Sequence, residues 1–261
     1  MKFHIVIPAR FNSTRLPGKP LLDIVGKPMI QHVYERAVES GAADVCVATD
    51  DERILRCVEG FGGRAIMTAE DHPSGVDRVA EVVRHREWPD EAIVVNLQGD
   101  EPLMEPALVN QLARALHQHS EAGIATLATP ITERNEIFKP EVVKVVTDKA
   151  GWALYFSRAP IPWVRGDYEI PDQASFPDHI EPRRHLGLYA YRVRALKALT
   201  AYDPCSIERA ESLEQLRALW HGIRIHVSVI QDVPAPGVDT PQDLETVRTL
   251  LMHRDQSYDN C

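Results

Sequence analysis

The hydrophobic residues in the first half of the chain alternate between short continuous runs and runs with helical spacing. The continuous runs are rich in β-branched residues, as is typical of buried strands. They lie at residues 3–7, 45–48, 65–67 and 92–97. Between them, apolar residues recur every three or four positions, and the predicted helices span residues 29–37, 51–58, 74–85 and 106–119. This alternation predicts an open, mostly parallel sheet with helices on both faces, a Rossmann-like α/β fold.

The pattern changes after about Gly123, where we expect a smaller mixed sheet with some antiparallel strands. The predicted strands lie at residues 124–129, 142–147, 152–156, 186–192 and 225–230, and helices are predicted at 210–219 and 241–251. Residues 164–184 are rich in Pro, Asp and Arg. A connection of this length is usually a lid, an interface arm or a disordered segment. We therefore expect a single domain over residues 1–253, divided near residue 122 and followed by a polar tail at 254–261.

Composition narrows the class of protein. The 261 residues are 44% apolar and 26% charged, which fits one large domain or two small ones rather than a disordered chain. The 38 acidic residues outnumber the 29 basic ones and no basic block stands out, so we expect no binding to nucleic acid or to membranes. No apolar stretch approaches the ~18 residues of a membrane helix, and the start, MKFHIVIPAR, lacks the pattern of a signal peptide. The four cysteines have no C-x-x-C spacing, which favours free thiols in a reducing cytoplasm.

The loop after the first predicted strand has the composition of an anion-binding segment. Open α/β sheets bind their ligands at the carboxyl ends of the strands, where this loop lies. Residues 8–20 combine the cations Arg10, Arg15 and Lys19 with small hydroxyl residues and a glycine. Such a loop can wrap a polyphosphate with backbone N–H groups while its cations neutralise charge. The loop matches neither the Walker A nor the G-x-G-x-x-G pattern, so composition alone leaves a solvated basic loop as an equal alternative.

Two aspartates occupy comparable positions later in the chain. Asp100 follows the strand at 92–97, and Asp239 precedes the last predicted helix. A carboxylate at a strand end suits Mg²⁺, which prefers oxygen ligands. Turn formation and helix capping are the ordinary roles of such aspartates, and neither segment is a metal motif by spacing alone.

In their order along the chain, these segments resemble the CMP-Kdo synthetase (3-deoxy-manno-octulosonate cytidylyltransferase) family. The first loop matches over residues 6–21. The other matching segments are ATDDERI at 48–54, DHPSGVDRVAEV at 71–82, VNLQGDEPL at 95–103, VKVV at 143–146, ALYFSRAPIPW at 153–163, RHLGLYAYR at 184–192, ESLEQLRALW at 211–220 and GVDTPQDLE at 237–245. The sialic-acid cytidylyltransferases share the fold but have a different first loop.

Three positions depart from the family pattern. Pro73 and Val76 stand where Gln and Thr are expected, which bears on side-chain contacts to the base. Gln242 replaces an acidic residue in the first turn of a helix, where the change should matter little.

The resemblance implies a function. It implies a nucleotide-diphospho-sugar transferase-like fold in which residues 1–122 bind nucleotide and 123–253 bind the sugar acid and form a homodimer, with residues 164–184 as the expected contact. The implied reaction is Mg²⁺-dependent transfer of CMP from CTP to the anomeric hydroxyl of Kdo, for lipopolysaccharide synthesis in the cytoplasm. The alternatives are the same reaction on the 8-amino analogue of the sugar, or a nucleotide-sugar binding protein without turnover.

The resemblance also implies roles for individual residues. The expected catalytic residues are Lys19, Arg15, Asp100 and Asp239, of which Asp100 and Asp239 would bind the metal. The expected nucleotide-binding residues are Pro8, Ala9, Arg10, Arg15, Lys19, Ser74, Gly75, Arg78 and Gln98. The expected sugar-binding residues are Arg10, Gln98, Arg158, His185, Tyr189, Glu211 and Glu214. A sugar acid needs a cationic donor for its carboxylate and acceptors for its hydroxyls; for Glu214, an ordinary solvated position on a helix is an equal alternative.

Overall fold

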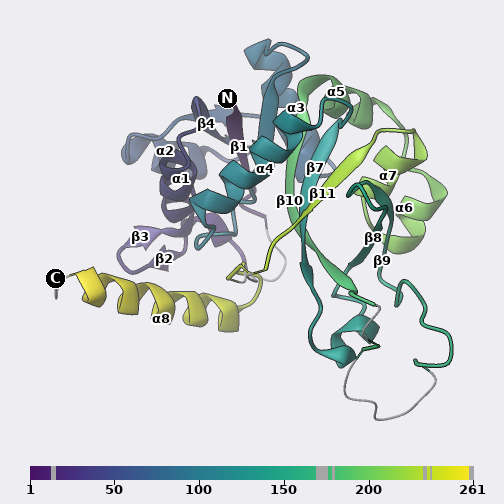
Figure 1. Cartoon of the computed structure of the whole chain (residues 1–261). Helices are drawn as coiled ribbons and strands as arrows, with labels where there is room; N and C mark the ends of the chain where they lie inside the picture. The colour runs from purple at the N-terminus through teal and green to yellow at the C-terminus, as the bar shows by residue number, and fades with distance from the viewer. Residues whose placement is uncertain (13–15, 169–175, 178–179, 232–233, 236, 259–261) are drawn as a thin grey trace. The chain divides into compact units, whose positions relative to one another are not determined.

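The computed structural model describes the chain except for residues 13–15, 169–175, 178–179, 232–233, 236 and 259–261 (Figure 1). The chain forms two compact units, one of residues 1–111 with 234–261 and the other of residues 112–233. The division falls eleven residues before the expected one (122 − 111), and the last helix belongs to the first unit instead of the second half. Among the described residues, no helix has the length and apolar character needed to span a bilayer.

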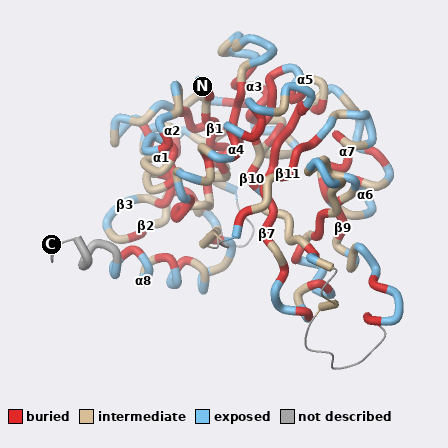
Figure 2. The backbone as a smooth tube through the Cα atoms, in the orientation of Figure 1, coloured by how far each residue is buried: buried red, intermediate tan, exposed pale blue. Residues whose placement is uncertain are grey.

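The first unit contains four parallel strands. They are β1 (His4–Ala9), β4 (Asp44–Thr49), β5 (Ala65–Met67) and β6 (Ile93–Asn96). Within this unit the order is β6-β1-β4-β5, so β1 lies between β6 and β4, with Ile5 in register with Val45 and Val95. Figure 2 shows β1 mostly buried, and β4 and β6 are buried in the same way, as their continuous apolar runs predict, whereas β5 is only partly buried. Because the strands are parallel, the loops that follow them meet at one edge.

Helices alternate with these strands, as the apolar spacing predicts. They are α1 (Met29–Glu39), α2 (Glu52–Gly60), α3 (Gly75–Arg86), α4 (Pro106–Gln118), which continues into the second unit, and α8 (Pro241–Tyr258). A short helix, η1 (Lys19–Leu21), and the hairpin of β2 (Asp23–Ile24) and β3 (Lys27–Pro28) follow the first loop. Asp51 caps α2 by accepting from the N–H of Arg53 at 2.8 Å, and Ser74 caps α3.

The C-terminal helix packs within the first unit through a separate apolar cluster. Its buried members are Ile24, Met29, Leu103, Val238, Leu244, Val247 and Leu251. Thr240 and Asp243 form a capping box at its start: the N–H of Asp243 donates to the Thr240 hydroxyl at 3.2 Å, and the N–H of Thr240 donates to the Asp243 carboxylate at 2.8 Å. The helix continues to Tyr258, beyond the end expected near Leu251, and takes up most of the segment predicted to be a tail.

The second unit contains a mixed sheet. Its strands are β7 (Ile124–Pro130), β8 (Lys144–Thr147), β9 (Ala153–Ser157), β10 (Arg183–Arg192) and β11 (Ile225–Val229). Strand β7 pairs parallel with β11 and antiparallel with β10, and β8 pairs antiparallel with β9 and β10. Over both units, the mostly parallel strands, flanked by helices, confirm the predicted fold class.

The helices of the second unit are α5 (Val193–Ala201), α6 (Ser206–Glu211), α7 (Gln215–Trp220) and the short η2 (Arg134–Phe138). The single helix predicted at 210–219 is therefore two shorter ones. The chain turns at Ser212, whose φ of 51° ends α6 in the left-handed conformation.

Candidate active site

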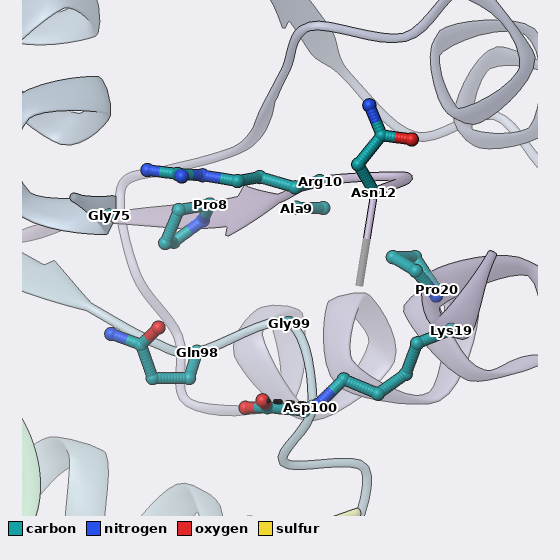
Figure 3. A pocket seen from close by; sticks show the side chains of 10 residues that line it. All are labelled: Pro8, Ala9, Arg10, Asn12, Lys19, Pro20, Gly75, Gln98, Gly99 and Asp100. Atoms are coloured by element: carbon teal, nitrogen blue, oxygen red, sulfur yellow. Dashed lines mark hydrogen bonds and ion pairs between the residues drawn. The ribbon is translucent and has the colours of Figure 1, made fainter. Parts of the chain in front are cut away.

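A pocket opens at the carboxyl edge of the parallel strands, in the first unit (Figure 3). Its lining residues are Pro8, Ala9, Arg10, Asn12, Lys19, Pro20, Gly75, Gln98, Gly99 and Asp100. Six of the nine residues expected to bind nucleotide are among them, together with one of the two expected metal ligands. They come from the end of β1, the loop after it, the start of α3 and the loop after β6. The topology thus brings together residues that lie up to 92 positions apart in the sequence (100 − 8).

The loop after β6 lies close against the end of β1. A Cβ atom at Gly99 would lie 2.9 Å from the carbonyl oxygen of Pro8, closer than real Cβ contacts allow. Gly99 is therefore required for the loop after β6 to approach the end of β1. Any larger residue at position 99 would push this loop, and Asp100 with it, away from the first loop.

Lys19 lies at the centre of the charged residues. Its Nζ donates to Asp100 Oδ2 at 2.7 Å, to the carbonyl oxygen of Val238 at 2.7 Å and to Asp239 Oδ1 at 3.2 Å. The Lys19 side chain is 13% exposed, whereas those of Asp100 and Asp239 are 33% and 53% exposed. Three of the four expected catalytic residues therefore meet at one point; the fourth, Arg15, lies outside the described residues.

The packing of the C-terminal segment explains how Asp239 reaches this point. The N–H of Val238 donates to the carbonyl oxygen of Asp100 at 2.8 Å. The buried Val238 side chain packs in the same apolar cluster as Leu103, three residues after Asp100. The segment before α8 is thus fixed beside the loop after β6. Because Asp239 is the next residue after Val238, its carboxylate is placed near Asp100.

Glu101 is a third carboxyl group that the sequence analysis did not single out. Burial, together with the negative charges of Asp100 and Asp239, raises its pKa to about 7, while the Lys19 charge opposes this shift. Its oxygen would lie 3.0 Å from a Cβ placed on Gly237, so it packs closely against the segment that holds Asp239. In the sequence, Glu101 could have been recognised as a candidate site residue because it directly follows Asp100 in the Gln-Gly-Asp-Glu-Pro segment.

Arg10 supplies a cation to the pocket. Figure 3 shows its side chain extending along the pocket past Pro8. Its Nη2 is buried and has no hydrogen-bond partner in the part of the chain that the structure describes. Burying an unpaired guanidinium N–H is costly, so this atom is poised for an anionic ligand.

Ser74 and Arg78 have structural partners in this structure. The Ser74 hydroxyl accepts from the N–H of Asp77 at 3.2 Å, as the helix cap requires. Arg78 is 0% exposed and donates to Asp50 Oδ2 at 2.6 Å and to the Thr68 hydroxyl, which ties α3 to the ends of β4 and β5. The role of these two side chains in nucleotide binding stays a prediction, and at this corner it is Gly75 that lines the pocket.

His185 and Tyr189 lie together in the second unit, with ring centroids 5.3 Å apart on β10. His185 Nε2 lies 3.0 Å from the hydroxyl of Thr126, which is also within hydrogen-bonding distance of the carbonyl oxygens of Leu186 and Leu188. Because the hydroxyl has one proton to donate to a carbonyl, Nε2 donates to the hydroxyl and Nδ1 is the acceptor. Burial lowers the pKa of His185 to about 3, so the ring is neutral. His185 is therefore suited to a sugar hydroxyl and not to the carboxylate.

The remaining expected sugar-binding residues also belong to the second unit. The Glu211 carboxylate accepts from the Ser157 hydroxyl at 2.6 Å and from the N–H of Arg158 at 2.9 Å. The Arg158 guanidinium in turn donates to the carbonyl oxygen of Glu211 at 2.7 Å. These contacts tie the end of β9 to the end of α6. Glu214 lies near Tyr189, and burial together with this negative charge raises the pKa of the tyrosine well above its usual range.

Comparisons with known proteins agree on one family. A family model described as cytidylyltransferase matches residues 4–225. A relative in Halorhodospira halophila, named 3-deoxy-manno-octulosonate cytidylyltransferase, is 56% identical over 249 residues, which cover 95% of this chain and 96% of the relative. A relative of the same name in Nitrosococcus oceani is 50% identical over 258 residues, which cover 99% of this chain and 100% of the relative. A solved CMP:2-keto-3-deoxy-manno-octonic acid synthetase in complex with CTP is 47% identical, with a TM-score of 0.87 over 97% of this chain and 100% of that one. A cytidylyltransferase from Leptospira borgpetersenii, 17% identical with a TM-score of 0.60 over 97% of this chain and 87% of that one, shares the fold.

Proposed function

Because the chain belongs to the cytidylyltransferase family, we propose that it transfers CMP from CTP to the anomeric hydroxyl of 3-deoxy-D-manno-octulosonate (Kdo) and releases pyrophosphate. The observation that carries this proposal is the meeting of Lys19, Asp100 and Asp239 at the mouth of a pocket lined by Arg10. The names of relatives that match this chain over nearly their whole length support the choice of Kdo as acceptor. We also propose a place in lipopolysaccharide synthesis, as the family resemblance implies.

The described residues can carry out nucleotidyl transfer by positioning and charge neutralisation. The sugar hydroxyl attacks the α-phosphorus of CTP and loses its proton to solvent, a new P–O bond forms, and the bond to pyrophosphate breaks. Negative charge grows on the leaving pyrophosphate, so cations held in place before the reaction lower the barrier most effectively. Arg10 has an unpaired N–H to offer a phosphate oxygen, and Lys19 adds a second positive charge to the lining of the pocket.

The carboxylates of Asp100 and Asp239 fit a magnesium ion. Both are oxygen donors, both are partly exposed, and one Lys19 ammonium reaches both of them. Among the described residues, no set of three His, Cys, Asp or Glu side chains has the geometry of a metal site, so phosphate oxygens and water would complete the coordination. When held by Asp100 and Asp239, Mg²⁺ would neutralise charge on the phosphates.

For the acceptor, we propose that β10 supplies contacts to the sugar hydroxyls. The neutral His185 offers Nδ1 as an acceptor, and the protonated Tyr189 hydroxyl offers a donor. The carboxylate of the sugar needs a cation, a role for which Arg10 is the proposed residue. Gln98, Arg158, Glu211 and Glu214 complete the proposed sugar-binding set.

We also propose that the protein is a homodimer. Three of the exposed apolar side chains of the second unit mark the proposed contact: Phe138 at 44%, Leu154 at 59% and Trp163 at 54%. The rings of Phe138 and Trp163 each lie 5.3 Å from that of Tyr168, so they form one aromatic surface. A second copy of the chain would remove this surface from water. Residues 164–184 belong to the proposed contact, although 169–175 and 178–179 lie outside the described residues.

We propose a cytoplasmic location because the described cysteines form no disulfide bond. Cys46, Cys57 and Cys205 are all free thiols, as expected for a reducing compartment.

Pyrophosphate release over a matrix of nucleotides and sugar acids tests the proposed reaction. We expect release with CTP and Kdo in the presence of Mg²⁺, and little with ATP, GTP or a sialic acid. Release with the 8-amino analogue in preference to Kdo would reassign the acceptor. Binding of CTP without release for any acceptor would make the chain a nucleotide-sugar binding protein and contradict the proposal.

A further inference from the structure

An arginine outside the pocket lies over an aromatic ring at the base of the first loop. The guanidinium carbon of Arg53, on α2, is 3.3 Å from the ring centroid of Phe11. This distance is well inside the range of a cation–π contact. Arg53 does not line the pocket, and its side chain is 60% exposed.

Arg53 is held in this position by Asp51. The Asp51 carboxylate accepts from the Arg53 backbone N–H at 2.8 Å, from Nε at 3.0 Å and from Nη2 at 2.6 Å. A bidentate pair of this kind fixes the plane of the guanidinium. The hydrogen bonds from the Arg53 side chain lower the pKa of Asp51. The carboxylate is therefore ionised at neutral pH, and its ion pair with Arg53, here called the tether, persists. An exposed side chain is thereby held in one orientation.

The same Phe11 ring closes the base of the loop against Gly18. The N–H of Gly18 donates to the carbonyl oxygen of Phe11 at 3.0 Å. A Cβ at Gly18 would lie 3.1 Å from Cε2 and 3.2 Å from Cζ of the ring. The φ of Gly18 is +67°, a conformation that favours glycine, and a Cβ there would press against the ring. The position of the ring therefore fixes the point at which the chain leaves the loop.

Gly18, where the chain leaves the first loop, is followed directly by Lys19. Gly18 is the N-cap of η1, and its carbonyl oxygen accepts from the N–H of Leu21 at 2.8 Å. Lys19 is the first residue of η1, and its Nζ reaches Asp100. A shift of Gly18 would move the start of the Lys19 side chain by a similar amount.

We propose that Arg53 is a positioning residue for nucleotide binding, which acts through Phe11 on Gly18 and so on the placement of Lys19. The inference rests on the proposed function, in which Lys19 binds the phosphates of CTP. The competing arrangement is one in which the exposed guanidinium of Arg53 contacts a phosphate itself. The two differ in whether the effect of Arg53 depends on the Phe11 ring.

Kinetics of Arg53→Met give the first test. Methionine keeps much of the bulk and removes the charge. We expect KM for CTP, and the dissociation constant of CTP measured by calorimetry, to rise by about twofold to fivefold, the size of an exposed cation–π contact. KM for Kdo, kcat at saturating CTP and the thermal unfolding midpoint should stay unchanged, and Arg53→Lys should recover part of the loss. Arg56→Met is the matched control, because Arg56 is exposed on the same helix and pairs only with Glu52 among the described residues.

A double-mutant cycle with Phe11 gives the decisive test. Phe11→Leu removes the ring and should raise KM for CTP, whereas Phe11→Tyr keeps the ring and should behave as wild type. In the Phe11→Leu background, Arg53→Met should have no further effect. An effect of full size in that background would mean that Arg53 contacts the nucleotide directly, and the inference would be wrong.

A variant of the tether separates the two arrangements a second time. Asp51→Asn loosens the Arg53 side chain without removing its charge. Under our inference, this variant should have a higher KM for CTP. If Arg53 binds phosphate itself, the KM for CTP should fall or stay unchanged. An unchanged KM in Arg53→Met would also overturn the inference. Failure of the proposed function is distinguishable from either result, because the wild-type protein would then release no pyrophosphate from CTP.

Discussion

The ammonium of Lys19 and the carboxylate of Asp100 form a 2.7 Å ion pair at the carboxyl edge of the parallel strands, although 81 positions separate them in the chain. A lysine ammonium has three N–H donors. All three have acceptors here, because Lys19 also reaches the Val238 carbonyl and Asp239. A phosphate oxygen must therefore replace one of these contacts, and the longest, to Asp239 at 3.2 Å, is the weakest of the three.

Removal of the Lys19 charge should impair turnover strongly. We expect Lys19→Ala to lower kcat/KM for CTP by more than tenfold, which corresponds to at least ~1.4 kcal/mol of transition-state stabilisation. Lys27→Ala is the matched control, because Lys27 is exposed and pairs with Glu35 outside the pocket. Steady-state pyrophosphate release measures both variants. Unchanged CTP kinetics in Lys19→Ala would return the first loop to the solvated alternative.

The two aspartates should be indispensable to metal-dependent turnover. Asp100→Ala and Asp239→Ala should each nearly abolish activity at any Mg²⁺ concentration, because each removes one of the two proposed carboxylate ligands. Circular dichroism and thermal unfolding should show an intact fold in both variants. Asp203→Ala, at an exposed position, should behave as wild type. Wild-type Mg²⁺ dependence in either aspartate variant would identify that residue as a structural aspartate.

Local patterns were sufficient to predict the parallel half of the fold. The strand that ends at Asn96 and the helix capped by Ser74 follow from continuous and helical apolar spacing, which are properties of single segments. Capping of the last helix by Thr240 follows from residue type in the same way. The meeting of Lys19 with two distant aspartates came from the family resemblance, because no local pattern contains it.

Features that depend on distant partners escaped prediction. Arg78 is expected from the sequence only as a nucleotide-binding residue, and its complete burial and its ion pair with Asp50, at the end of another strand, have no local signal in the sequence. The neutrality of His185 depends on burial, and its tautomer on Thr126, 59 positions away. The helix break at Ser212 has no glycine or proline to mark it. The raised pKa of Glu101 requires a low-dielectric environment that only the folded chain creates.

A buried histidine in the second unit should make stability depend on pH. His226 stacks on His119 with ring centroids 3.6 Å apart, and its Nδ1 is buried with no hydrogen-bond partner among the described residues. Burial, reinforced by His119, lowers the pKa of His226 from 6.5 to about 4, while Asp148 opposes the shift. The unfolded chain therefore binds more protons between these values, and stability present above pH 6.5 is lost as the pH falls towards 4.

Replacement by a residue that cannot titrate should flatten this dependence. We expect His226→Phe to remove up to about 3 kcal/mol of the loss in unfolding free energy between pH 6.5 and 4. Urea unfolding at several pH values measures it. His117→Gln, at an exposed position on α4, should leave the slope of the wild type unchanged. An equally steep slope in His226→Phe would assign the acid sensitivity to other groups.

The exposed aromatic surface of the second unit should control assembly. Sedimentation of the wild type should give the mass of two chains. Trp163→Asp should shift the distribution towards the monomer, because it places an unpaired charge where a partner would exclude water. Trp220→Asp is the matched control, since Trp220 is similarly exposed, at 58%, but is not part of the surface formed with Tyr168. A monomeric wild type at working concentration would refute the homodimer.

The last prediction concerns the contacts proposed for the sugar acid. His185 is neutral, and the Thr126 hydroxyl fixes its Nδ1 as an acceptor, so it should bind a hydroxyl group of the sugar. We expect His185→Ala to raise KM for Kdo by about tenfold, the value of a lost hydrogen bond to a positioned group. The dissociation constant of CTP, measured by calorimetry without sugar, should stay unchanged.

A change at Thr126 tests whether the hydroxyl sets the tautomer of His185. Thr126→Val keeps the shape of the side chain and removes the hydroxyl, so His185 is free to move its proton to Nδ1 and lose the acceptor. KM for Kdo should then rise in Thr126→Val, and by less than in His185→Ala because one tautomer still presents the acceptor. The pH profile of kcat/KM should have no inflection from His185 between pH 5 and 8, because its pKa of about 3 lies below that window. An equal loss of CTP affinity in His185→Ala would place the residue in the nucleotide site or in the core, and the proposed sugar contacts would be wrong.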